Sequence, residues 1–196
     1  MNWQMRIGVT AAGLLLALWS AAPAAAQFNQ SEYTDVDLDQ CTVISADDFG
    51  ATWACNGYKG MPVMIAEGDL RMFVSYGLTS TEEPAATQTL PPFNTLGPKI
   101  EWRLSNAEGG YRPFATILRW KLSRTDPESG EPMRDGEVLV VTRIEPGATC
   151  QVAWVDALAN PNANELARQA ADDLAPDFAC GEVPRIVGEF EAFDVE

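Results

Sequence analysis

Four cysteines constrain the fold of this chain of 196 residues more than any other feature of its sequence. They are Cys41, Cys55, Cys150 and Cys180, so consecutive cysteines are 14, 95 and 30 residues apart. Structural zinc sites use close pairs such as Cys-x₂-Cys, and redox sites use Cys-x-x-Cys, so these separations fit neither kind of site. An even number of cysteines without such spacing is typical of structural disulfides, which persist outside the reducing cytosol.

The first 26 residues predict export to an oxidising compartment. Arg6 supplies a positive charge, an apolar run of about 13 residues follows it, and an alanine triplet at 24–26 forms a small-residue cleavage signal. The apolar run is too short to cross about 30 Å of hydrocarbon as a permanent anchor. We therefore expect a Sec-type signal peptide over 1–26, cleavage between Ala26 and Gln27, no membrane anchor after cleavage, and a soluble protein that is periplasmic or secreted.

The spacing of the cysteines favours the pairs Cys41–Cys55 and Cys150–Cys180 among the three connectivities that four cysteines allow. A strand that starts at Cys150 and continues for eight residues would extend roughly 26 Å. A turn and a helix of about 15 residues would then return roughly 22 Å in the opposite direction. Cys180 is therefore expected to lie near Cys150.

Alternation of apolar and polar residues predicts a mainly antiparallel sheet. In residues 100–104 and 114–122 every second residue is apolar, except for one threonine. A valine-rich run at 138–144 is expected to pair with the strand before it. A hairpin over 62–76 and a strand at 150–157 bring the sheet to about six strands.

One amphipathic helix is expected after the last of these strands. Apolar residues, mostly alanine, recur at i, i+3, i+4, i+7, i+8 and i+11 from Ala163 to Leu174. Asn162 is placed to cap the helix, with Glu165 as its capping-box partner, and Pro176 helps to end it. The expected fold is therefore α+β: a mainly antiparallel sheet with one C-terminal helix packed on it, stapled by two disulfides.

We expect a single domain over 27–181, after the signal peptide, and a C-terminal tail or edge strand over 182–196. Within the domain, residues 27–40 have the composition of an extended lead-in. Residues 77–99 contain four prolines and predict a long surface loop.

The charge and the missing residue types limit the possible functions. The chain has 28 acidic and 13 basic residues and a net charge of −15, which disfavours nucleic acid and anionic membranes as partners. A basic envelope protein or a neutral ligand is compatible with this charge. Without histidine there can be no Ser-His-Asp or Cys-His site and no histidine-ligated zinc or haem. No nucleophile motif or phosphate-binding loop is present, so we assign no catalytic residue and expect no cofactor or metal.

The acidic pattern at Asp35, Asp37 and Asp39 resembles the opening of a calcium loop. Such a loop needs glycine at its sixth position and glutamate at its twelfth. Those positions hold Gln40 and Ala46, so a solvated acidic segment is expected instead.

The tryptophans divide into core candidates and one candidate contact residue. Trp102, Trp120 and Trp154 lie on the apolar faces of predicted strands, which favours the core. Trp53 lies in the first disulfide loop and near Tyr58, so these two aromatic residues are candidates for an exposed binding surface.

Two carboxylates, Glu101 and Asp156, are the remaining candidates for ligand binding or catalysis. Glu101 shares a strand face with Arg103 and is expected to pair with it on the surface. Asp156 lies near the end of a strand, where a carboxylate can accept hydrogen bonds from loop N–H groups or present itself to a ligand. A glycosidase would need two carboxylates roughly 5–9.5 Å apart.

Three segments, 66–71, 100–103 and 155–164, resemble small exported proteins of Gram-negative bacteria. The resemblance implies the compartment and no catalytic residue. The preferred hypothesis is a non-enzymatic binding or structural module of the bacterial envelope. The alternatives are a small carboxylate-based hydrolase or lyase that acts on envelope glycans, and an inhibitor that binds a basic envelope enzyme through the acidic surface.

Overall fold

The computed structural model describes Met1 and residues 28–107, 109–123, 129–131 and 135–194. The expected signal peptide, apart from Met1, and its cleavage site lie outside the described residues.

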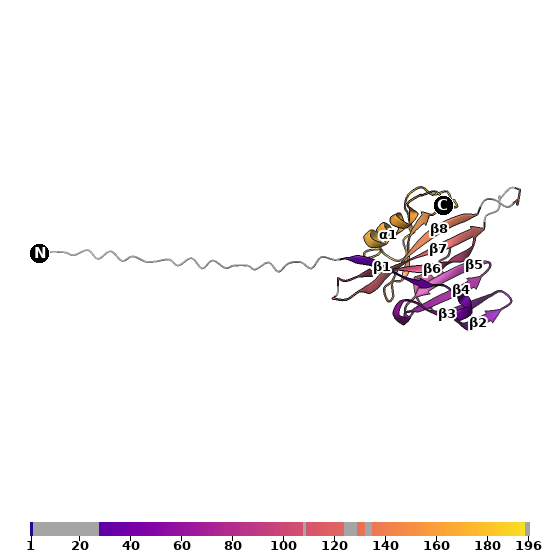
Figure 1. Ribbon diagram of the computed structural model, residues 1–196, viewed down its shortest axis with the longest axis horizontal. Helices are drawn as coiled ribbons and strands as arrows, with labels where there is room; N and C mark the ends of the chain where they lie inside the picture. The colour runs from indigo at the N-terminus through magenta and orange to yellow at the C-terminus, as the bar shows by residue number, and fades with distance from the viewer. Residues whose placement is uncertain (2–27, 108, 124–128, 132–134, 195–196) are drawn as a thin grey trace.

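Two sheets and one α-helix form three layers in the described part of the chain (Figure 1). The larger sheet has the strand order β1-β6-β7-β8-β9-β10, and the smaller sheet has the order β2-β3-β4-β5. Neighbouring strands are antiparallel, except that β10 pairs parallel with β9. The strands of the larger sheet are β1 (Asn29–Asp35), β6 (Phe93–Ser105), β7 (Arg112–Ser123), β8 (Gly136–Arg143), β9 (Cys150–Asp156) and β10 (Arg185–Ile186). Those of the smaller sheet are β2 (Thr42–Asp47), β3 (Gly50–Asn56), β4 (Pro62–Gly68) and β5 (Arg71–Tyr76). The helix is α1 (Ala163–Leu174), and three short 3₁₀ helices are η1 (Leu38–Gln40), η2 (Tyr58–Gly60) and η3 (Pro84–Thr87).

The expected α+β class is confirmed, as are both disulfide pairs. Cys41 is bonded to Cys55, and Cys150 is bonded to Cys180. The first bridge joins η1 and β2 to β3, and the second joins the start of β9 to the segment after α1. The expected count of about six strands describes the larger sheet alone, because the hairpin of β4 and β5 belongs to a separate sheet.

Two segments that were not assigned to the expected sheet contain strands. Residues 29–35 of the expected lead-in form β1, because their backbone pairs with β6 at the edge of the larger sheet. In the expected loop over 77–99, β6 already begins at Phe93. Pro98 is accommodated where the register between β6 and β7 shifts, and its carbonyl accepts a hydrogen bond from the Val36 N–H.

The main core lies between the two sheets, on the side of the larger sheet that we call its inner face. Trp102, Trp120 and Trp154 are buried there, as their alternation predicted. Phe190 and Phe193 of the C-terminal segment pack against this core, with the ring of Phe193 5.5 Å from that of Trp154. Residues 182–194 therefore supply both the short edge strand β10 and apolar cover for the core.

The second core lies between α1 and the opposite face of the larger sheet, which we call the helix face. Four alanines of the predicted stripe are buried against it: Ala163, Ala167, Ala170 and Ala171. The small side chains allow the helix to lie close to the sheet. Asn162 occupies the N-cap position, but its side chain makes no capping hydrogen bond to a described residue. The expected capping box is therefore wrong, because the backbone of Asn162 (φ −108°, ψ 27°) is not in the extended conformation of a typical N-cap.

Among the described residues, no helix is both long enough and apolar enough to cross a membrane.

Candidate functional site

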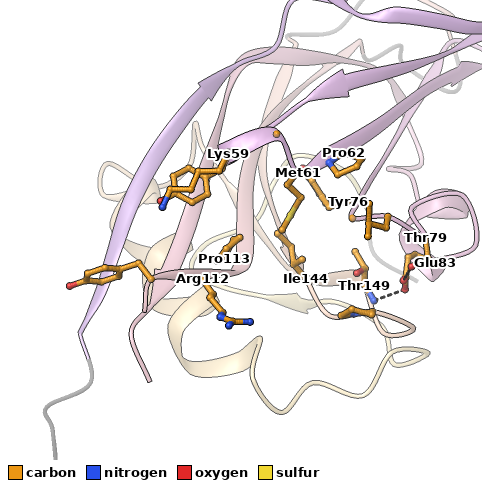
Figure 2. A pocket seen from close by; sticks show the side chains of 16 residues that line it. Lys59, Met61, Pro62, Tyr76, Thr79, Glu83, Arg112, Pro113, Ile144 and Thr149 are labelled. Carbon is orange, nitrogen blue, oxygen red and sulfur yellow. Dashed lines mark hydrogen bonds between the residues drawn. The ribbon is translucent and has the colours of Figure 1, made fainter. Parts of the chain in front are cut away.

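A pocket of about 730 Å³ lies where β4 begins and β5 ends, and both sheets contribute to its wall (Figure 2). This volume is in the range of small-molecule sites. The smaller sheet supplies Pro62 and Tyr76, and the larger sheet supplies Arg112 and Pro113 at the start of β7. The η2 turn supplies Tyr58, Lys59 and Gly60. Loops complete the wall with Met61, Gly77, Leu78, Thr79, Glu83, Tyr111, Ile144, Pro146 and Thr149.

One wall of the pocket is fixed by a close contact between the η2 turn and the core. A Cβ atom at Gly57 would lie 2.3 Å from the ring of Trp102, so only glycine allows the turn to approach this closely. The Gly57 N–H donates a 2.8 Å hydrogen bond to the Met61 carbonyl, which closes the turn. Tyr58 is thereby held against Trp102, with ring centroids 6.4 Å apart.

Tyr76 forms the inner part of the pocket and is almost completely buried. Its ring meets Trp102 edge-on, with centroids 5.6 Å apart. Burial raises the pKa of Tyr76, so its hydroxyl stays protonated at physiological pH. This residue therefore gives the pocket a neutral aromatic surface rather than a charge.

Glu83 is the one acidic residue among the described residues that line the pocket. Its carboxylate accepts hydrogen bonds from the Thr79 hydroxyl (2.6 Å), the Gly147 N–H (2.8 Å) and the Thr149 N–H (3.0 Å). Burial by itself would raise the pKa of Glu83, but the hydrogen bonds outweigh it and hold the pKa below the ordinary value. The residue is therefore ionised at neutral pH, and its bonds join the loop before η3 to the loop after β8.

We expect Glu83→Gln to lower the free energy of unfolding by about 2 kcal/mol at pH 7, because an amide cannot accept all three bonds as a carboxylate does. Since folding lowers the pKa of Glu83, its contribution is complete above the unfolded-chain value of about 4.3 and is lost as the pH falls through the folded value. Melting curves from pH 3 to pH 7 should therefore show wild type and variant converging at the acid end. The control is Glu82→Gln, at the exposed neighbouring residue. Equal effects of the two variants at pH 7 would contradict this role of Glu83.

Two basic residues, Lys59 and Arg112, line the part of the pocket that lies away from Glu83. Figure 2 shows both on one side of Met61 and Ile144, and Glu83 on the other. The Lys59 ammonium lies 5.1 Å from the centroid of the Tyr58 ring. The pocket thus has a cationic end, an apolar middle and an anionic end.

Of the two aromatic candidates from the sequence, Tyr58 lines the pocket and Trp53 does not. Trp53 lies on β3, where its half-buried side chain packs against the main core. The structure therefore separates these two residues, although they are close in sequence.

Glu101 and Arg103 do not pair with each other on the surface, so that expectation is wrong. Both are buried on the helix face, and each pairs with a residue of α1. Glu101 accepts a 2.6 Å hydrogen bond from Arg168, and Arg103 donates two bonds, of 2.9 and 2.6 Å, to Asp172. The Ser31 hydroxyl donates to Glu101 and accepts from Arg103, so it links the two ion pairs.

The carboxylate of Asp156 is occupied by backbone N–H groups. One oxygen accepts from Leu158 (2.8 Å) and Ala159 (3.0 Å), and the other accepts from Glu191 (3.0 Å). These bonds hold the loop after β9 and the C-terminal segment together, which is the structural role considered from the sequence.

Glu101 and Asp156 do not form a carboxylate pair. Glu101 is opposite Ile117 on the helix face, whereas Asp156 is opposite Val138 on the inner face. The two strands, β6 and β9, are also three strand spacings apart, or about 14 Å. This separation exceeds the roughly 5–9.5 Å of a glycosidase pair.

The acidic run near the N-terminus has internal partners. Asp35 pairs with Lys99, and an oxygen of Asp37 accepts a hydrogen bond from the Asp39 N–H. Within the described part of the chain, no three acidic or cysteine side chains are grouped as a metal site would require.

Most of the pocket residues were not candidates from the sequence. Met61, Ile144 and Glu83 come from separate loops, and no motif in their local sequence marks them as binding residues. No protein-family model, no curated protein and no solved structure matches this chain. The functional argument therefore rests on the pocket itself.

Proposed function

We propose that this protein is an exported, non-enzymatic binding module of the bacterial envelope whose pocket encloses the apolar part of a small ligand. The observation that carries the proposal is the pocket of about 730 Å³, with Met61 and Ile144 between its two charged ends and aromatic rings in its wall (Figure 2). Apolar concave sites with a few polar groups are the usual form of small-molecule sites. Two disulfides and the alanine triplet before Gln27 support export.

The chemistry of the pocket favours binding over catalysis. A general base needs a pKa near the operating pH, whereas the pKa of Glu83 is lowered and its oxygens already accept three hydrogen bonds. Tyr76 is held in its neutral form by burial. The hydrolase alternative also loses its best pair, because Glu101 and Asp156 lie on opposite faces of the larger sheet.

A neutral apolar dye, N-phenyl-1-naphthylamine, tests the proposal. Its fluorescence increases in apolar surroundings, so titration of the oxidised protein from Gln27 to Glu196 should give a saturable increase. We expect Ile144→Asp to weaken dye binding about tenfold or more, because a carboxylate in the pocket is costly to desolvate. The matched control is Val43→Asp on β2, where the side chain is 57% exposed and lies outside the pocket.

Near-ultraviolet circular dichroism should confirm that both variants are folded. The proposal predicts that Val43→Asp binds the dye as the wild type does. No saturable binding by the wild-type protein, or the same loss in both variants, would contradict it.

A further inference from the structure

We propose that the ligand of this pocket is a single-chain amphiphile whose anionic head lies beside Lys59. This inference rests on the proposed function and adds the chemical class and the orientation of the ligand. The head group is defined by its negative charge, which a carboxylate or a phosphate monoester would supply.

The charge of the pocket lining is opposite in sign to that of the whole protein. The chain has a net charge of −15, yet the 16 residues that line the pocket include two cations, Lys59 and Arg112, and one carboxylate, Glu83. Two of the 13 basic residues of the chain are therefore placed in this one wall. At close range, the ammonium of Lys59 favours an anionic head group despite the negative net charge of the chain.

Lys59 is held at the rim of the pocket by its backbone. Its φ of 50° and ψ of 33° are in the left-handed region, which a residue other than glycine adopts at some cost in energy. The neighbouring Gly60 also has a positive φ, and the turn is closed by the bond from Gly57 to Met61. Lys59 is an exposed residue and its ammonium lies beside the Tyr58 ring, where a ligand head can reach it.

The opposite end of the pocket determines the orientation. Glu83 is ionised there, so it repels an anionic head, and its three hydrogen bonds already occupy both carboxylate oxygens. Between the two ends, Met61 and Ile144 offer apolar contact for a chain. The ligand is therefore oriented with its head at Lys59, away from the repulsion of Glu83, and with its chain against Met61 and Ile144.

The first experiment compares four probes with the same twelve-carbon chain: dodecanoate, dodecyl phosphate, dodecanol and dodecylamine. Isothermal titration calorimetry below the critical micelle concentration gives each affinity for the wild-type protein. We expect both anions to bind about tenfold more tightly than dodecanol, because a charge-assisted hydrogen bond is added to the same apolar contact. Dodecylamine should bind more weakly than dodecanol. The ratio of the two anions distinguishes a carboxylate from a phosphate head.

The second experiment removes the charge of Lys59 and keeps its apolar stem. Lys59→Met should weaken dodecanoate binding about tenfold and leave dodecanol binding within about twofold, whereas Lys59→Arg should keep most of the affinity for dodecanoate. The matched control is Lys121→Met, which changes the net charge equally at an exposed position on β7 outside the pocket. It should leave every affinity within about twofold.

The outcomes separate this inference from the proposed function. If dodecanol binds as tightly as dodecanoate, or if dodecylamine binds most tightly, the anionic head is wrong while the apolar pocket stands. The same conclusion follows if Lys59→Met and Lys121→Met behave alike. If none of the four probes binds while N-phenyl-1-naphthylamine does, the amphiphile is wrong and the apolar pocket stands. If neither the probes nor the dye bind, the proposed function is contradicted as well.

Discussion

Asp172→Ala should lower the free energy of unfolding by about 3–5 kcal/mol, because it leaves the charge of Arg103 buried without its partner. The side chain of Arg103 is only 8% exposed, and two of its nitrogens donate to the Asp172 carboxylate. Ser31, which remains, accepts a single bond from Arg103. Thermal or urea unfolding measures the effect, which corresponds to a fall in melting temperature of about 6–20 °C for a domain of this size.

Replacement of the other member of this ion pair, Arg103, should lower the free energy of unfolding by less. Arg103→Met leaves Asp172, whose side chain is 28% exposed and can be hydrated, so the remaining charge is less costly than a buried guanidinium. Asp173→Ala is the matched control, because it makes the same change at an exposed position of α1. If Asp172→Ala and Asp173→Ala had equal effects, the ion pair would not contribute to stability as argued.

Removal of the Cys150–Cys180 bridge is the second large effect. Replacement of both cysteines by alanine should lower the free energy of unfolding by about 3.5 kcal/mol, from the loop-entropy model for a closed loop of 30 residues. The bridge ties the segment after α1 to β9, so its loss should also allow local opening of the helix. Hydrogen exchange should show faster exchange of the amides of α1.

The other disulfide provides the comparison. The Cys41–Cys55 bridge closes a loop of 14 residues, for which the same model gives about 3 kcal/mol. Its removal should destabilise the protein globally without selective exchange in α1, because the bridge joins the residue before β2 to β3, far from the helix in the sequence. Selective exchange in α1 after loss of either bridge would contradict this division.

The sequence predicted those strands and the helix in which buried and exposed residues alternate with a regular period. The strands around Trp102 and Trp120 and the alanine stripe of α1 follow from periods of two and 3.6 residues. The division into two sheets did not follow, because a hairpin such as β4 and β5 gives the same local pattern in either sheet. β1 was missed because its exposed and half-buried side chains show no apolar alternation, and its pairing with β6 depends on the backbone.

The ion pairs between β6 and α1 show a second reason why the sequence did not predict the contacts of some residues. Residues i and i+2 of a strand are about 6.6 Å apart, and residues i and i+4 of a helix rise about 6 Å. Glu101 and Arg103 therefore match Arg168 and Asp172, but only once the helix lies on that face. Because the sequence does not show that α1 packs on this face, it predicted that Glu101 and Arg103 pair with each other.

The pocket depends on packing to an even greater extent. Its wall combines the η2 turn, the loop before η3, the start of β7 and the loop after β8. Tyr58 was identified as a candidate because it is aromatic and close to a disulfide loop. Ile144 and Glu83 had no such signal, since their role depends on distant segments that only the folded chain brings together.

Methyl NMR of the oxidised protein with ¹³C-labelled methionine and isoleucine tests the central claim most directly. Dodecanoate should shift the methyl signals of Met61 and Ile144 with a saturable dependence on concentration. The methyl signals of Met72 and Ile65, which are buried in the core and do not line the pocket, should stay in place. If Met61 and Ile144 do not shift, or if all four residues shift alike, the pocket is not the binding site.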